Sequence, residues 1–506
     1  MSKRRATTGI GLALLLALPA GGCESFLAVN DNPNEPESVR MEQTLPGLIV
    51  AFTNDVLAGA PAEWSGQWLQ QWSYNRDEMP YSQIELYELT SIDTDEFWSD
   101  AYTNVMVEAR NIMDEAAASE AWAYHGIAKF LLAWTATIVS DAFGPIPFSE
   151  ALDPLNPDPA YDTQQEVYQA AHQMIEEAIE EMQRPGDRVP SANDLLLAGD
   201  MARWVQLART VQARLHMRLT NAPGESAEER AQQALNALAE GITETVAFDY
   251  VGGPGARQPL WNSVEWDDPQ TASSTFIALL ERLDDPRLPI MVAPAAYDGA
   301  YRGHVPGALR NITGDPFFDE QDRCTVAPES CDPADENYPT IAWNDSIVSH
   351  LGDALLADSV DYVWMSLAEA KFLEAEAQLI VNGAAAADAP YRDGIRAHME
   401  WLGVPAAEIQ TYLDALPSLT AVPNAEEAII TQKYIANFMR IEAWNDWRRT
   451  GYPVLTLVED PYVPGIPQRL RTPAAEINNN GENVAATGIP TGLDGLLHEV
   501  WWASGN

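Results

Sequence analysis

Positive charge is scarce in this sequence. Its 506 residues include 29 Lys and Arg against 75 Asp and Glu, which gives a formal net charge of -46. Only four lysines occur, Lys3, Lys129, Lys371 and Lys433. Nucleic-acid binding needs clustered Lys and Arg to neutralise phosphates, so we exclude DNA and RNA as partners. Such an acidic surface repels other copies of itself and favours solubility in salt.

Cysteine is also rare, with three residues in the whole chain. Cys324 and Cys331 stand close together in an acidic segment that contains proline. We predict that they form a local disulfide, with free thiols as the alternative, because an exported chain meets oxidising conditions. A zinc site is not expected, since no second Cys pair and no His-x-x-x-His accompanies them. We predict neither a metal nor a cofactor.

Motifs of known catalytic machinery are missing as well. The sequence has no Gly-x-Ser-x-Gly elbow, no Walker loop and no His-Glu-x-x-His, and its seven histidines are scattered. Pairs of carboxylates suited to glycoside cleavage arise by chance in so acidic a chain. We therefore predict a protein that is not an enzyme. A surface glycoside hydrolase or esterase is the alternative.

The N-terminus has the pattern of an export signal. A basic Lys-Arg-Arg run at residues 3–5 precedes a short apolar run at residues 10–18, and Pro-Ala-Gly-Gly leads into Cys23. The apolar run is too short for a permanent membrane helix, which needs about 20 residues. We predict a lipoprotein signal peptide at residues 1–22, lipid attachment at Cys23, and a polar tether at residues 23–40. We expect no membrane-spanning helix after it.

The rest of the chain, residues 41–506, has helical periodicity and predicts one large, mainly α body with long irregular loops. Apolar residues recur every three or four positions in most of it, in segments 42–118, 121–139, 163–183, 200–219, 226–240, 272–283, 361–382, 391–401, 408–415 and 426–447. Helices of similar length joined by short turns suggest tetratricopeptide-like pairs. The predicted pairs are 94–118 with 121–140, 163–183 with 200–219, and 361–382 with 426–447.

Residues 245–350 differ in composition and are the candidate ligand-binding region. Gly, Pro, Trp and Asp are frequent there, which is typical of long loops on a rigid scaffold. A sugar site needs flat apolar rings beside amides and carboxylates that bond hydroxyls. The candidates of this kind are Trp261, Trp266, Tyr297, Tyr301, Trp343 and Asn344.

Two other aromatic groups favour packing over binding. Trp64, Trp68 and Trp72 have the spacing of one helical face, and we expect them to pack inside the protein or against a partner. Arg448 and Arg449 follow Trp444 and Trp447 at a predicted helix end, where cations complement the negative pole and stack on indoles. Asp285-Pro286-Arg287 is expected to fix a turn.

Several segments, taken in order, resemble the SusD/RagB family of outer-membrane nutrient-binding lipoproteins. They are Asn-Asp-Asn-Pro-Asn at 30–34, Asp-Ala-Phe-Gly-Pro-Ile-Pro at 141–147, Asp-Pro-Arg-Leu-Pro at 285–289, Leu-Ala-Glu-Ala-Lys-Phe-Leu-Glu-Ala-Glu-Ala at 367–377, Glu-Ala-Trp-Asn-Asp-Trp-Arg-Arg-Thr-Gly-Tyr-Pro at 442–453, and the stretch at 469–480. The resemblance implies a SusD-like α-α superhelix, display at the cell exterior by a lipid anchor in the outer membrane, and a SusC-like TonB-dependent transporter as partner. It also implies a glycan or peptide ligand. A helical-repeat adaptor that binds no ligand is the remaining alternative.

Overall fold

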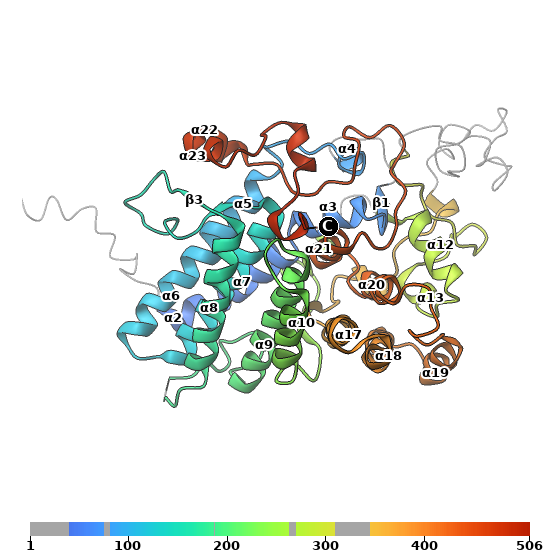
Figure 1. The fold of residues 1–506 in the computed structure, drawn as a ribbon, viewed down its shortest axis with the longest axis horizontal. Helices are drawn as coiled ribbons and strands as arrows, with labels where there is room; N and C mark the ends of the chain where they lie inside the picture. The colour runs from blue at the N-terminus through green and yellow to red at the C-terminus, as the bar shows by residue number, and fades with distance from the viewer. Residues whose placement is uncertain (1–39, 75–80, 187, 263–269, 309–344, 506) are drawn as a thin grey trace, which may run out of the picture. The chain divides into compact units, whose positions relative to one another are not determined.

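A computed structural model describes residues 40–74, 81–186, 188–262, 270–308 and 345–505. Helices dominate these residues, as predicted, and the strands form three two-stranded sheets (Figure 1). Residues Met41–Asn506 make up one unit by their internal contacts. The prediction of a mainly α fold is confirmed.

The α-helices are α2 (Met41–Ala51), α3 (Ala60–Trp68), α4 (Tyr81–Glu85), α5 (Asp95–Asp100), α6 (Val107–Ala118), α7 (Trp122–Phe143), α8 (Gln164–Met182), α9 (Met201–Arg218), α10 (Ala227–Leu238), α11 (Pro259–Asn262), α12 (Ser274–Arg282), α13 (Leu288–Met291), α16 (Asp353–Leu356), α17 (Leu367–Asn382), α18 (Ala384–Trp401), α19 (Ala406–Ala415), α20 (Ala425–Ala436), α21 (Ile441–Thr450), α22 (Ala474–Asn479) and α23 (Gly481–Ala486). Two π-helical turns, η2 (Phe52–Leu57) and η3 (Ala101–Met106), extend α2 and α5. The 3₁₀ turns in the described part of the chain are η4 (Leu219–Asn221), η6 (Asp345–Ile347), η7 (Leu493–Leu497) and η8 (Trp501–Ala503). The antiparallel sheets are β1 (Trp72–Tyr74) with β5 (Gln270–Ala272), β2 (Ile146–Pro147) with β3 (Tyr161–Asp162), and β4 (Val246–Phe248) with β6 (Tyr362–Met365).

The long helices pack as a continuous array. Helix α6 packs on α7, α7 on α8, α8 on α9 and α9 on α10, and α10 then packs on α17, which packs on α18. Figure 1 views α17, α18 and α19 end-on, in a row. The predicted pair 94–118 with 121–140 is confirmed. In the other two predicted pairs the helices touch, but each of these helices has a larger contact with another neighbour. Helix α8 packs mainly on α7, α9 mainly on α10, and α17 mainly on α18.

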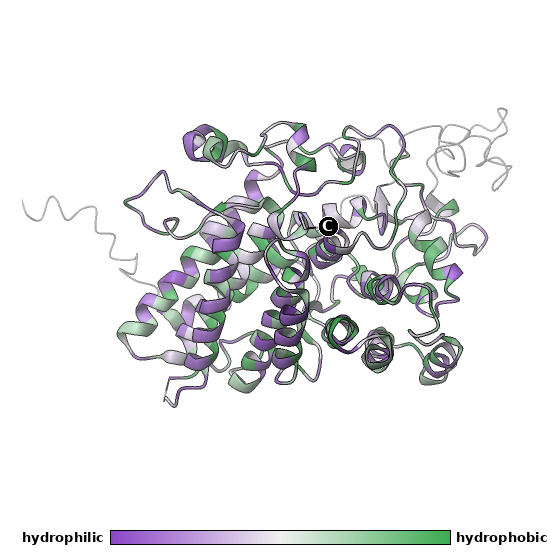
Figure 2. Cartoon of the chain, in the orientation of Figure 1, coloured by the Kyte–Doolittle hydropathy of each residue, from purple (hydrophilic) through white to green (hydrophobic). Residues whose placement is uncertain are grey.

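Small side chains explain why α10 joins the two halves of this array. Ala231, Ala234 and Ala237 form a buried stripe on α10, and they pack with Ala213 of α9 and Ala377 of α17. Alanines at helical spacing let helix backbones approach closely. Figure 2 shows the same amphipathic pattern in α8, α9 and α10, with hydrophilic residues on the outer side.

Helix α7 is the centre of the main core. Nearly all of its residues are buried, and Trp134 packs edge-on against Trp364 with ring centroids 5.9 Å apart. By length and composition, α7 and the run Met41–Trp68 could each cross a membrane, contrary to our expectation. The apolar window of α7 is 100% buried inside the protein, so the apolarity of α7 serves the core.

The predicted helix 426–447 is in fact two helices, and a distant side chain explains the break. Met439, between α20 and α21, has a φ of 51°, outside the helical region. Its backbone N–H donates to Gln71 Oε1 at 2.8 Å, and Gln71 Nε2 donates to the carbonyl of Tyr434 at 3.0 Å. Gln71 thus satisfies backbone groups that a continuous helix would have paired itself.

The sequence landmarks meet in a buried ionic network. Asp141 of α7 accepts Arg218 Nη1 at 2.6 Å, and Arg218 also pairs with Glu442 of α21. Arg214 lies between Glu369 of α17, at 2.7 Å, and Glu442, at 3.3 Å. Burial opposes ionisation of Glu442, yet Arg214 and Arg218 hold its pKa at about 2. Segments at 141, 369 and 442 are therefore joined by charge as well as by packing.

A second buried cluster supports the structural interpretation of the arginines after Trp444. Arg449 pairs with Glu376 and Asp446, and Lys433 pairs with the same two carboxylates at 2.8 and 3.0 Å. Arg448 stacks on Trp444, with its guanidinium carbon 3.5 Å from the ring centroid. The stacking of Arg448 confirms the predicted packing role, and the ion pairs of Arg449 are contacts that the sequence did not predict.

The Asp285-Pro286-Arg287 turn is likewise internal. Arg287 is fully buried, and its Nε donates to Asp285 Oδ1 at 2.8 Å. Its Nη1 donates to His398 Nδ1 on α18 at 2.9 Å. The expectation that this segment fixes a turn is confirmed.

Candidate functional site

The described part of the candidate loop region rests on a small framework of strands. β5 pairs with β1 in the register Trp72 to Ala272, and Thr271 also bridges to His350. A second bridge joins Val292 to Leu351. Residues 270–308 and 345–351 are thus tied together by backbone hydrogen bonds, and this gives the loops a fixed base.

Tyr297 and Tyr301 lie on one loop above this base. The Tyr297 side chain is 39% exposed, and its backbone N–H donates to the Ser346 carbonyl at 2.8 Å. Arg302 pairs with Asp298 at 2.6 Å and donates from Nε to the Ile347 carbonyl at 2.9 Å. Tyr301 is half-buried against the main core. Of the two rings, Tyr297 is therefore the more accessible one.

Trp261 lies on a separate segment, the short helix α11. The Arg257 guanidinium covers its ring at 4.1 Å from the centroid, and the indole is half-buried. Asp358 holds the preceding turn, because its carbonyl accepts Gln258 N–H at 3.0 Å and its carboxylate accepts Gly253 N–H at 2.9 Å. The indole is thus held beside a cation on a well-anchored turn.

The other residues predicted from sequence fall elsewhere. Trp266, Trp343 and Asn344 lie outside the described residues, as do Cys23, Cys324 and Cys331. The described structure therefore brings Tyr297 and Tyr301 together on one loop and leaves Trp261 on another.

The Trp64, Trp68 and Trp72 group is internal. All three indoles are buried, at 5%, 0% and 1% exposure. Trp68 Nε1 donates to the Ile84 carbonyl at 2.9 Å, and its ring packs edge-on against Trp444. The predicted packing role is confirmed, but the shared helical face is wrong for Trp72, which belongs to β1.

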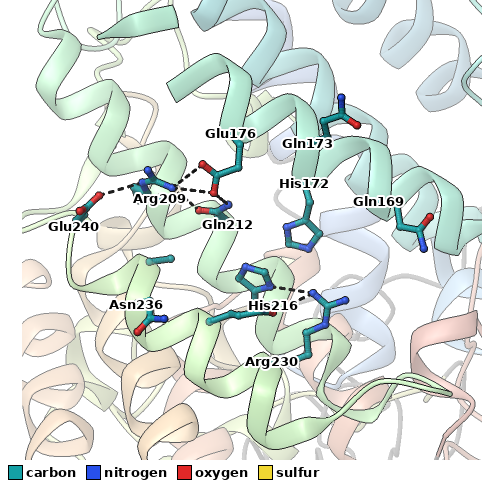
Figure 3. Close-up of a pocket in the computed structure, with 12 residues that line it drawn as sticks. Gln169, His172, Gln173, Glu176, Arg209, Gln212, His216, Arg230, Asn236 and Glu240 are labelled. Atoms are coloured by element: carbon teal, nitrogen blue, oxygen red, sulfur yellow. Dashed lines mark hydrogen bonds and ion pairs between the residues drawn. The ribbon is translucent and has the colours of Figure 1, made fainter. Parts of the chain in front are cut away.

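A polar groove between α8, α9 and α10 is a site that the sequence analysis missed (Figure 3). Its volume is about 630 Å³. At its centre the imidazoles of His172 and His216 stack at 4.4 Å between centroids, with an interplanar angle of 23°. Around them lie planar amides and charged groups, from Gln169, Gln173, Glu176, Arg209, Gln212, Arg230, Gln233, Asn236 and Glu240.

The two imidazoles are held in their neutral form. Burial, with Arg230 nearby, lowers the pKa of His172 to about 4. Burial, with His172 and Arg230, lowers the pKa of His216 to about 2. Neither ring nitrogen of His172 has a hydrogen-bond partner among the described residues, whereas Arg230 Nη1 donates weakly to His216 Nδ1 at 3.4 Å. The two rings are therefore neutral, and the unpartnered nitrogens of His172 are buried.

One wall of the groove is fixed by charge. Arg209 donates to both Glu176 oxygens, at 3.0 and 3.1 Å, and to Gln212 Oε1 at 3.1 Å. Within the ranges that the structure describes, no group of three His, Cys, Asp or Glu could hold a metal ion. Sequence spacing could not reveal this groove, because His172 and His216 belong to different helices.

Comparison with known proteins decides the family. Residues 33–473 match the SusD-like family described as "Starch-binding associating with outer membrane". The chain belongs to the SusD-like family. The resemblance found in the sequence is thereby confirmed, and the family is one of binding proteins rather than enzymes.

Solved structures share this fold at low sequence identity. A SusD/RagB family protein from Bacteroides thetaiotaomicron is 20% identical with a TM-score of 0.75, over 93% of this chain and 100% of that one. A chitin-binding protein is 23% identical with a TM-score of 0.73, over 92% and 100%. A SusD homolog from Bacteroides uniformis is 21% identical with a TM-score of 0.71, over 92% and 98%. No curated protein matches the sequence.

Proposed function

We propose that this SusD-like protein is a lipoprotein of the outer membrane that binds a glycan at the cell exterior and delivers it to a SusC-like TonB-dependent transporter. The family match over residues 33–473 carries this proposal. One similar structure is that of a chitin-binding protein, which also favours a glycan over a peptide.

The glycan would bind at the loops of residues 245–350. Tyr297 offers an accessible ring on a loop that Ser346 and Ile347 hold in place. Trp261 offers a second ring, ordered by Arg257. Flat rings stack on the apolar C–H face of a sugar. Asp298 and Arg302 lie near Tyr297 in the sequence and would bond the hydroxyls of that sugar.

Binding of malto- and chito-oligosaccharides by calorimetry tests this proposal. Tyr297→Ala and Trp261→Ala should each weaken binding about 10-fold, because each removes part of a stacking surface. Trp122→Ala is the matched control, since Trp122 is also half-buried under an arginine, with Arg184 at 4.6 Å. Equal losses in all three variants, or tight binding of peptides and no glycan, would refute the loop site.

The anchor and the partner are tested separately. Cys23→Ser should move the protein from the membrane pellet to the soluble fraction, whereas Cys324→Ser should leave it in the pellet. Affinity purification from native membranes should recover a large β-barrel transporter with the wild type. If Cys23→Ser stays in the pellet, the lipid anchor is wrong, and if no transporter is recovered, delivery is wrong.

A further inference from the structure

A second cavity lies away from the loops and the groove, at the end of α7. Its lining comes from the turn after α7 (Gly144 and Pro145), the start of α8 (residues 163–165), Arg469, and residues 487–504 near the C-terminus. Its volume is about 680 Å³, which accommodates one or two sugar units.

Arg469 is the unusual member of this lining. It is 3% exposed, and among the described residues it donates one hydrogen bond, from Nε to the carbonyl of the next residue, Leu470, at 3.1 Å. Nη1 has no acceptor, and no carboxylate pairs with this guanidinium among the described residues. The buried Arg214, Arg218, Arg287 and Arg449 all have carboxylate partners.

A buried guanidinium without a counter-charge is costly. Burial lowers the pKa of Arg469 to about 10, which still leaves it charged at neutral pH. Natural proteins retain such a cost where a ligand supplies the missing charge. Gly144 lies beside it, and a Cβ at this glycine would meet Nη1 at 3.9 Å, in ordinary van der Waals contact.

The remaining lining combines a ring with polar groups, and it includes the exposed carboxylate of Glu499. Trp501 is half-buried, and Tyr168 fixes it from one side in an edge-on contact at 6.5 Å. Thr487 and Ser504 donate their hydroxyl protons to the Val484 and Trp501 carbonyls, and Thr487 Oγ1 also accepts the Ile489 N–H at 3.3 Å. Ser504 Oγ and one lone pair of Thr487 Oγ1 are left as acceptors. Gln165 adds an exposed amide, which can both donate and accept.

We propose that this cavity binds a uronic acid unit of a glycan, with the carboxylate on Arg469 and the sugar face on Trp501. A guanidinium forms charge-assisted hydrogen bonds with a carboxylate, and because Nε of Arg469 donates to the Leu470 carbonyl, the two terminal nitrogens remain for this contact. The inference rests on the proposed glycan binding, but it concerns a different cavity and a different sugar class from the loop site.

Calorimetry on the full chain with tri-galacturonate tests the inference, with the neutral galactose trimer as the matched probe. Arg469→Met should weaken tri-galacturonate binding about 10- to 100-fold and leave the binding of neutral oligosaccharides unchanged. Arg469→Lys should retain part of the affinity, and Trp501→Ala should lose about 10-fold. Trp122→Ala, which lies outside both proposed sites, should leave tri-galacturonate binding intact.

Thermal melting separates a binding role from a structural one. Without ligand, Arg469→Met should melt at or above the wild-type temperature, because the variant removes an unpaired buried charge. If it melts several degrees lower, or tri-galacturonate binds no better than the neutral trimer, the inference is overturned. If Arg469→Met does not fold, equal affinity of Trp501→Ala and wild type for tri-galacturonate overturns it. If the wild type binds tri-galacturonate but no neutral glycan, only the loop site is refuted.

Discussion

Asp141 is the acceptor at which four elements distant in sequence meet. Its Oδ2 accepts Arg218 Nη1 at 2.6 Å, and its Oδ1 accepts Trp502 Nε1 at 2.8 Å and the Tyr168 hydroxyl at 2.5 Å. Asn445 of α21 approaches Oδ2 at 3.4 Å. Asp141 is itself only 2% exposed, so water cannot replace any of these bonds.

We expect Asp141→Asn to destabilise the fold by about 3–5 kcal/mol, because Arg218 then keeps only Glu442 as a buried counter-charge and three donors lose a charged acceptor. Asn preserves the volume, but its amide donates where Arg218 or Trp502 also donates. In a chain of 506 residues, the entropy of unfolding is about 1 kcal/mol/K if the chain unfolds as one unit. The melting temperature should therefore fall by about 3–5 °C in differential scanning calorimetry.

Asp114→Asn is the matched control. It breaks the Arg110 pair at 3.3 Å, whose side chains are 55% and 71% exposed, and should cost no more than about 0.5 kcal/mol. If the melting temperature of Asp141→Asn falls no more than that of this control, the buried contacts of Asp141 do not stabilise the fold as we propose. Should Asp141→Asn fail to fold, Trp502→Phe removes only one donor and should cost about 1–2 kcal/mol.

Three further predictions follow from particular contacts. Between about pH 7 and pH 5, unfolded His172 gains a proton that the folded protein does not bind, because burial lowers the folded pKa to about 4 from the ordinary imidazole pKa of about 6.5. His172 should therefore contribute about 2 kcal/mol to the loss of stability as the pH drops, and His172→Phe should reduce the total loss by about that amount in urea titrations at both pH values. Gln71→Ala should lower the free energy of unfolding by about 2–3 kcal/mol, because two buried backbone groups lose their hydrogen-bond partner. Hydrogen exchange of the Met439 amide should become faster. An unchanged exchange rate at Met439 would contradict this explanation of the helix break. Gly126→Ala should lower the melting temperature, since its Cβ would lie 2.8 Å from the Ala178 carbonyl oxygen. Gly47→Ala is the control, and it should leave the melting temperature unchanged or raise it, because no atom lies within 4 Å of its Cβ position. Similar melting temperatures for the two variants would show that α7 and α8 are not as closely packed as described.

Local patterns in the sequence were sufficient for most helices. The apolar run 121–139 predicts α7 within a few residues, and Thr163 with Glu166 forms the capping box that begins α8. The packing role of the tryptophans and of Arg448 and Arg449 also followed from residue type and spacing. These features depend on neighbours three or four positions away, so the sequence alone contains the necessary information.

The candidate sites were predicted only in part. Tyr297 and Trp261 could be proposed from composition, because aromatic residues in a Gly- and Pro-rich segment indicate exposed loops. Arg469 could not, since nothing next to it in sequence shows whether its guanidinium has a counter-charge. The stacked pair His172 and His216 is equally hidden, because each histidine alone is an ordinary helix residue.

Tertiary structure decided the helix partners, the break between α20 and α21, and the charge network around Asp141. Gln71 reaches Met439, and Asp141 reaches Glu442 through Arg218, across most of the chain. Such contacts form only when packing excludes water and leaves buried polar groups to find one another. By itself, the sequence of this SusD-like protein therefore determined which segments are helices and which family they belong to, while the packing of those helices decided which side chains are paired, buried or left open to a ligand.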